Sequence, residues 1–190
     1  MKKFMPSIFI LVFGLCVMSF QVADTTNDTD IVQWGTKLKL DDFKGTVDTK
    51  KDQNSFSYII YTYNEKITGD SVKVVLKNTF YRKYSWIKNE VKTKEQLNHE
   101  QGFFDISAIN AARMRKTLLT NPIYKNTANK QIGALYSQTI KDRAKEQGQY
   151  QAETEYGKNK VKQSEWDKKL KDLLKTLEKY NGQAITIKMK

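Results

Sequence analysis

The first half of the chain has the residue pattern of β-strands. Residues 55–64 are rich in aromatic and β-branched side chains, which is the composition of a strand. A turn at residues 68–70 separates them from residues 71–81, where apolar and polar positions alternate. This alternation predicts a second strand that pairs with the first as a hairpin, and residues 80–87 predict a third extended segment. The apolar positions of the second strand are Val72, Val74, Leu76 and Phe80.

From residue 93 onward the apolar spacing changes to that of helices. Thr93, with Gln96 three residues later, predicts the N-terminus of a helix that runs to about residue 119. A second helix is expected over residues 128–150, and a third from Ser164, with Asp167 in its capping position. Residues 184–189 predict a final strand. Strands followed by three helices indicate an α+β domain. Its inward-facing helical positions are predicted to include Leu97, Phe104, Ala108, Ala111, Ala112, Leu118 and Leu119 in the first helix.

The composition supports a folded domain with an apolar core. Hydrophobic residues make up 39% and aromatic residues 12% of the 190 residues, too many for a disordered chain. This length favours one domain. We divide the chain into a leader at residues 1–23, a tether at residues 24–33 and the domain at residues 34–190.

The leader resembles a secretory signal peptide. Lys2 and Lys3 precede an apolar run over residues 8–20, which is short for a membrane span, and cleavage could follow Ser19. Cys16 is the only cysteine, so the alternative is a lipoprotein signal with lipid attached there; an uncleaved anchor is a further alternative. We therefore expect an exported protein, periplasmic or secreted, with no span in the mature chain, or one anchored through Cys16.

The charge bears on possible partners. The formal net charge is +12, but lysines are spread along nearly the whole chain and arginines are few. No recognised nucleic-acid motif is present, so sequence-specific nucleic-acid binding is not expected. An exported basic protein more readily meets an anionic envelope polymer or lipid head groups. We expect the partner to be such a polymer, an envelope protein or a peptide.

The candidate chemistry lies in the first helix, at His99-Glu100-Gln101-Gly102-Phe103. In a His-Glu-x-x-His helix, two imidazoles four residues apart share one face and bind zinc, and the Glu is the general base. Here Phe103 replaces the second histidine, and His99 is the only histidine in the chain. The simpler interpretation is that His99 is a partly buried histidine with an ordinary hydrogen-bond partner.

The wider pattern resembles a bacterial envelope family, domain of unknown function 922, described as a predicted secreted zinc-dependent protease. Its members typically read His-Glu-Gln-Gly-His-Phe-Asp-Ile and then an Ala-Arg pair, as this chain does over residues 99–106 and at Ala112-Arg113 except at Phe103. The resemblance covers about residues 34–177. Other matching segments are the opening over residues 34–45, then Phe80, Arg82 and Ser85-Trp86, then Tyr150 to Gly157, Gln163 and Trp166.

Two departures from that family determine the expected activity. Phe103 occupies the position of the second histidine, and Tyr156 occupies the position of a third candidate ligand. Loss of both imidazoles should abolish tight zinc binding, which leaves His99 as a vestigial ligand and Glu100 as a vestigial general base. We therefore expect no cofactor in this chain, although the resemblance implies zinc in the relatives. One hypothesis is that the two aromatic rings stack in the emptied site, and the alternative is an open cleft that Phe103 lines.

Three functions follow from these observations. The first is a non-catalytic binding domain, a pseudoenzyme on a zinc-protease-like scaffold. The alternative is an active metal-dependent peptidase or hydrolase that uses His99, Glu100 and nearby carboxylates, for which Asp105, Glu153 and Glu155 are the candidates. The third is a purely structural envelope component attached by lipid.

Overall fold

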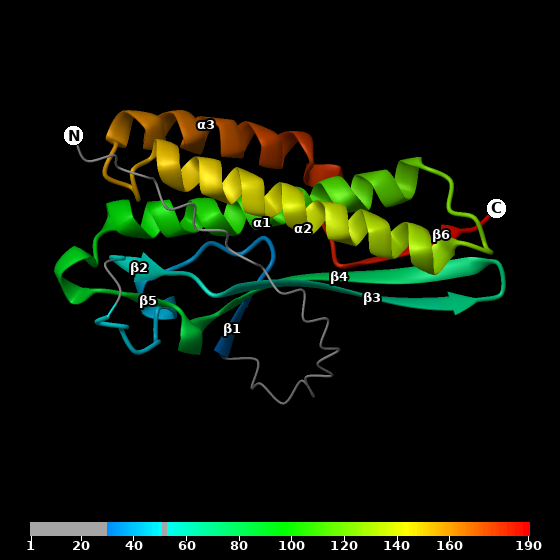
Figure 1. Cartoon of the computed structure of the whole chain (residues 1–190), viewed down its shortest axis with the longest axis horizontal. Coiled ribbons are helices and arrows are strands. Elements are labelled where there is room, and N and C mark those ends of the chain that lie inside the picture. The colour runs from blue at the N-terminus through cyan, green and yellow to red at the C-terminus, as the bar shows by residue number, and fades with distance from the viewer. Residues whose placement is uncertain (1–29, 51–52) are drawn as a thin grey trace, which may run out of the picture.

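The computed structural model of the chain describes residues 30–50 and 53–190. The predicted leader, with Cys16, and residues 24–29 of the predicted tether lie outside these residues. The described part has an antiparallel sheet on one side and three long helices on the other (Figure 1). This arrangement confirms the predicted α+β class and the order of strands before helices.

The main sheet is built around one long strand, β4 (Ser71–Tyr81). The strand β3 (Ile59–Thr68) pairs with it along its whole length through the turn at Gly69, as the predicted hairpin requires. Along the other edge of β4, β6 (Ala184–Lys188) pairs with the first half and β1 (Ile31–Gln33) with the second half. A separate two-stranded sheet is formed by β2 (Ser55–Phe56) and β5 (Trp86–Ile87).

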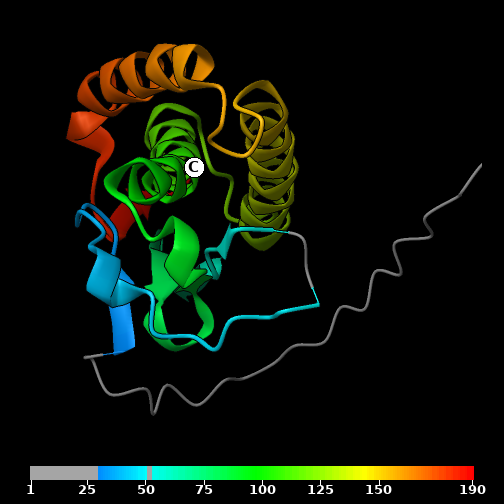
Figure 2. The same cartoon turned by 90° about the vertical axis from the view of Figure 1, so that its left-hand side faces the viewer.

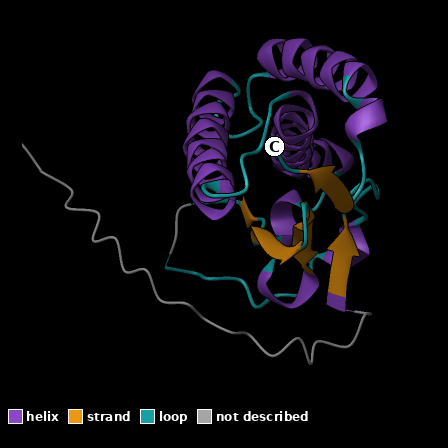
Figure 3. Cartoon of the chain, turned by 90° about the vertical axis from the view of Figure 1, so that its right-hand side faces the viewer, coloured by secondary structure: helices purple, strands orange, loops and turns teal. Residues whose placement is uncertain are grey.

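The three helices are α1 (Lys94–Thr120), α2 (Ala128–Glu153) and α3 (Lys160–Thr176). The Thr93 side chain accepts a hydrogen bond from the backbone N–H of Gln96, which confirms the predicted start of α1. End-on views show α1 between the sheet and α3, with α2 beside α1, which makes α1 the central element (Figures 2 and 3). Four short 3-10 helices complete the described elements, at Leu40–Asp42, Arg82–Tyr84, Asn89–Val91 and Glu178–Tyr180.

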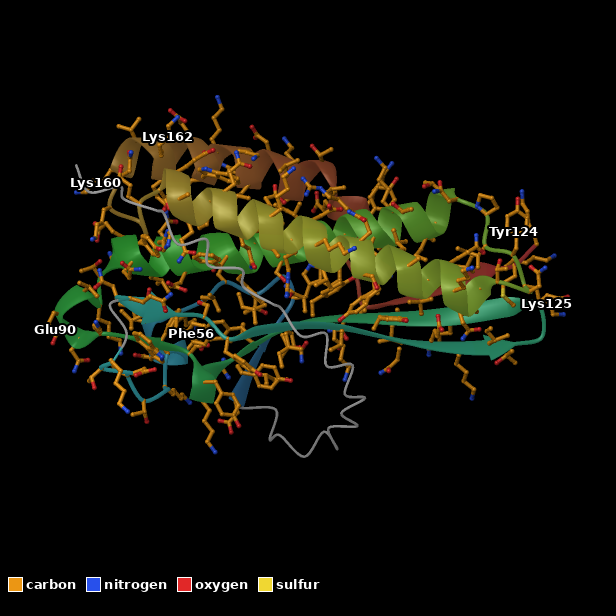
Figure 4. All side chains as sticks on the ribbon, viewed as in Figure 1. Phe56, Glu90, Tyr124, Lys125, Lys160 and Lys162 are labelled. Carbon is orange, nitrogen blue, oxygen red and sulfur yellow. The ribbon has the colours of Figure 1, made fainter. Side chains whose placement is uncertain are left out.

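The two halves of α1 have different surroundings. Its C-terminal half packs against the hairpin and β6, where the alternating residues of β4 are fully buried. Its N-terminal half lies beside β2 and the ends of α2 and α3. In Figure 4, Phe56 of β2 and Lys160 and Lys162 of α3 lie at this end of the molecule, and Tyr124 and Lys125 at the opposite end. The apolar cluster around the C-terminal half includes Tyr61, Val72, Val74, Leu76, Ala111, Met114, Leu118, Ile132 and Ile185.

Several local predictions differ from the structure. Strand β1 lies within the range assigned to the tether, and its pairing with β4 makes residues 31–33 part of the sheet. The segment 80–87 is not one extended piece, because a 3-10 turn at Arg82–Tyr84 interrupts it. Helix α3 begins at Lys160 and not at Ser164, because the Asn159 side chain caps the backbone N–H of Lys162 at 3.1 Å.

The predicted inward stripe of α1 is confirmed at most positions and wrong at one. Phe104, Ala108, Ala111, Ala112 and Leu118 are buried, whereas Leu119 is 47% exposed. Adjacent helix positions differ by about 100° in direction, so only one of the two leucines can face the sheet. Within residues 30–50 and 53–190, the helices do not include a segment with the length and apolar character needed to cross a bilayer.

Candidate functional site

A cleft of about 240 Å³ lies between the N-terminal half of α1, the second half of α2 and strand β2. His99, Glu100 and Phe103 line it from α1, and Tyr156 lines it from the turn after α2. The structure thus brings the four sequence-predicted site residues to one cleft. The other lining residues are Gln53, Asn54, Ser55, Phe56, Ser57, Ile59, Gln96, Arg143, Gln147 and Gln151.

Glu100 is buried, and its carboxylate is held by the β2 segment. The hydroxyl of Ser55 donates to one carboxylate oxygen and the hydroxyl of Ser57 donates to the other. Side chains two residues apart on an extended strand point to the same side, which is why this Ser-x-Ser pair reaches one carboxylate. The Gln96 side chain donates to the Ser55 hydroxyl at 2.7 Å and fixes the serine in turn. Both oxygens of the expected general base therefore already have partners in the protein.

His99 is held in one orientation by Gln163 of α3. The Gln163 amide nitrogen donates to the Tyr150 hydroxyl at 2.9 Å and to Asp167 at 2.8 Å. Its amide oxygen is therefore the atom that lies 3.1 Å from His99 Nδ1. This network assigns the proton of neutral His99 to Nδ1 and leaves the lone pair on Nε2. Burial lowers the pKa of His99, although the nearby Glu100 and the bond to Gln163 oppose the shift.

The ring that fills the site next to His99 is Tyr150. Its ring stacks on the imidazole at a centroid distance of 4.9 Å, and its hydroxyl donates to the His99 carbonyl at 2.9 Å. The ring of Phe103 packs edge-on against both, at 5.2 Å from each centroid. Gly102 makes this approach possible, because a Cβ there would lie 2.2 Å from the Tyr150 hydroxyl oxygen. Burial raises the pKa of Tyr150, so it acts as a neutral donor.

The expected stack of Phe103 on Tyr156 is wrong. Tyr156 is 50% exposed and lies in a tight turn, with φ of 59°. Among the described residues, the ring contacts of Phe103 are with His99 and Tyr150. The neighbouring Gly157 is the residue that packs on His99, because a Cβ there would lie 3.0 Å from the imidazole Cγ. Tyr150, and not Tyr156, therefore packs against the rings of His99 and Phe103.

The carboxylates suggested as alternative metal ligands lie elsewhere. Asp105 accepts from Gln101 at 2.6 Å, and Glu153 accepts from the Trp166 indole at 2.8 Å. Glu155 accepts from Asn159 at 3.4 Å. None of the three lines the cleft, and in the part of the chain that the structure describes no three His, Cys, Asp or Glu side chains are grouped to hold a metal ion. The absence of zinc from the protein itself stays a prediction.

Some site residues were not singled out by the sequence. The sequence indicated Ser55 and Ser57 only as strand residues, Gly102 only as part of the His-Glu-Gln-Gly motif, and Arg143 not at all. Tyr150 and Gln163 were noted only as part of the family resemblance. The Ser-x-Ser spacing was the one available indication, because it places two hydroxyls on one face of a strand.

Comparison of this chain with protein-family models, with curated proteins and with solved structures gave no match. The resemblance to domain of unknown function 922 therefore stays a prediction based on the quoted residues.

Proposed function

We propose that this chain is an exported envelope protein whose protease-like cleft binds a ligand without hydrolysing it. The observation that carries the proposal is that the Glu100 carboxylate is already hydrogen-bonded within the protein. Its carboxylate oxygens are occupied by Ser55 and Ser57, and the cleft beside it contains one imidazole and the phenyl ring of Phe103. A zinc hydrolase needs three protein ligands and a general base that reaches the metal-bound water.

The same cleft retains features that suit binding. Most of its polar lining is neutral, with five carboxamides and two serine hydroxyls, and Phe56, Phe103 and Tyr156 add aromatic surface. Concave sites with an apolar lining and a few placed polar groups are the usual form of a ligand site. The proposed partner is a peptide, a segment of an envelope protein or an anionic envelope polymer. Export, with the protein periplasmic, secreted or lipid-anchored through Cys16, rests on the leader sequence.

Metal analysis of the purified protein tests the proposal. We expect well under one zinc per chain after exposure to zinc and dialysis, and no change of the melting temperature on adding a chelator. Stoichiometric zinc, or a large fall of the melting temperature with chelator, would contradict the proposal and favour the hydrolase alternative.

Restoring the lost ligands sharpens this test. The variant Phe103→His with Tyr156→His adds two imidazoles to a cleft that already contains His99 Nε2, and the contact of Gly157 with the His99 ring places residue 156 nearby. We expect the double variant to bind zinc and each single variant to bind much less, since a tetrahedral site requires the third protein ligand. If the double variant binds no more zinc than the parent, the assignment of position 156 as a ligand site is wrong.

A further inference from the structure

One cationic side chain in the cleft has no acidic partner within residues 30–50 and 53–190. Arg143 of α2 lines the cleft, yet its Nε is buried and makes no hydrogen bond among the described residues. Among the described residues the guanidinium donates only to the Ser107 hydroxyl, at 3.4 Å. Burial lowers the pKa of Arg143, and the nearby Tyr136 and Tyr61 oppose the shift.

The other three arginines of the chain are satisfied differently. Arg82 pairs with Asp42 at 2.7 Å and Arg113 pairs with Glu146 at 2.8 Å. Arg115 donates to the backbone carbonyls of residues 182 and 184. Arg115 forms no ion pair among the described residues either, and its Nε is also buried without a hydrogen bond there. Arg143 differs from Arg115 because it lines the cleft. A buried charge is usually paired, so Arg143 is the arginine whose charge faces a ligand in the cleft.

Ser107, which accepts the hydrogen bond from Arg143, belongs to a buried polar pair with Asn78. Ser107 donates its hydroxyl proton to Asn78 Oδ1 at 2.6 Å, which leaves only its oxygen lone pairs for the arginine. The amide nitrogen of Asn78 is buried and also has no partner among the described residues. Arg143 and Asn78 thus both contact Ser107, and each has one buried nitrogen without a hydrogen bond among the described residues. The positive charge of Arg143, which lines the cleft, favours an anion over a cation there.

Along α2, the side chains that line the cleft recur every four residues. Arg143, Gln147 and Gln151 therefore share one helix face and form a row along one wall. The planar guanidinium matches a carboxylate with two parallel hydrogen bonds. A glutamine carboxamide both donates and accepts, as a peptide group does. The row pairs a carboxylate site with two peptide-like sites.

We propose that the cleft binds a peptide through a carboxylate, which Arg143 holds while Gln147 and Gln151 bond the adjoining peptide groups. This inference rests on the proposed binding function and names its ligand class. The carboxylate is that of a chain end or of an acidic side chain, since both present the same pair of oxygens to the guanidinium.

Calorimetric titration of the whole protein with small probes tests this. Acetyl-Ala-Ala carries a free terminal carboxylate, acetyl-Glu-amide carries only a side-chain carboxylate, and acetyl-Ala-Ala-amide carries neither. We expect one of the two acids to bind roughly ten- to hundredfold more tightly than the neutral probe, the range for hydrogen bonds to a charged group. The tighter acid identifies the source of the carboxylate. Tighter binding of glucuronate than of either acid would overturn the choice of a peptide.

Variants at position 143 complete the test. Arg143→Gln should remove the preference for the acids and leave the melting temperature unchanged or higher, because an uncompensated charge has been removed. Arg143→Lys should retain part of the preference through its charge without the planar fork. Lys145→Gln, an exposed position on the same helix, removes the same charge and should leave binding unchanged.

Three results would overturn the inference. They are no binding of either acid at millimolar concentration, equal binding of acids and neutral probe, or equal acid binding by the parent and Arg143→Gln. The second result would still leave the cleft as a binding site, so the proposed function would stand without this ligand class. The proposed non-catalytic function is tested by zinc content, and the carboxylate ligand is tested by calorimetry. The failure of one proposal can therefore be told from the failure of the other.

Discussion

The two halves of α1 are held in place by different kinds of interaction. In the C-terminal half, Met114 and Leu118 pack with Val72, Val74 and Leu76 of β4 in an apolar cluster. In the N-terminal half, buried polar side chains are held by specific hydrogen bonds; these include His99 with Gln163 and Glu100 with Ser55 and Ser57. Apolar burial is non-directional, whereas a buried polar group is costly unless each partner is present.

This difference separates the part of the helix that holds the fold together from the part that carries the site. The apolar half tolerates other apolar residues of similar volume. The polar half depends on individual residues, and Gly102 is required there because Tyr150 occupies the space of a Cβ. A helix that only stabilised the fold would not need buried polar side chains with specific partners. We therefore assign the proposed binding function to the N-terminal half of α1.

The largest expected effect comes from the apolar half. Leu118 is fully buried, so Leu118→Ala should lower the free energy of unfolding by about 2–5 kcal/mol, measured by urea denaturation. The adjacent Leu119 is 47% exposed and provides the matched control, since Leu119→Ala should change stability by less than about 0.5 kcal/mol. Similar losses for the two variants would mean that the orientation of this half of α1 is wrong.

The two halves also differ in how far the sequence predicted them. The apolar spacing identified the hairpin, all three helices and most of the buried stripe, because period and burial are properties of neighbouring residues. His99 and Glu100 were found by motif, but their partners were not. Gln163 lies 64 residues from His99, and Ser55 lies 45 residues from Glu100. Such contacts depend on tertiary arrangement and leave no periodic pattern in the chain.

The next effect tests whether the N-terminal half has a small aromatic core of its own. Phe103 is partly buried, so Phe103→Ala should cost about 2 kcal/mol, less than the roughly 3–5 kcal/mol of a fully buried ring. A double-mutant cycle with Tyr150→Ala should show coupling of about 0.5–1.5 kcal/mol, because the rings touch.

The matched control for that cycle is Tyr156→Ala. Its ring is half exposed and belongs to the same cleft, so its coupling to Phe103 should stay below about 0.5 kcal/mol. The reverse order of the two coupling energies would restore the stacked Phe103–Tyr156 pair and would overturn the packing described here.

The smallest expected effect is a dependence of stability on pH that only the polar half can produce. Burial lowers the pKa of His99 in the folded chain below its ordinary value of about 6.5. Below that value the unfolded chain binds a proton that folded His99 does not, so the free energy of unfolding falls as pH decreases through this range. Above about 6.5 the residue is neutral in both states and contributes no slope.

Urea denaturation at pH 7.5 and pH 5.5 measures this dependence. His99→Gln removes the titrating group, so it should lose less stability than the parent between the two pH values, whatever its stability at pH 7.5. Glu100 and Gln163 oppose the shift of the His99 pKa. The change of stability with pH should therefore be smaller than the losses expected for Leu118→Ala and Phe103→Ala. The carboxylates and the net positive charge are common to both proteins, so the difference between their losses isolates the histidine.

An equal loss in the two proteins would show that His99 titrates normally, and a larger loss in the variant would show that His99 gains a partner on protonation. In either case His99 would not be held neutral with its Nε2 lone pair available, and the N-terminal half of α1 would be less rigidly organised than its hydrogen bonds indicate.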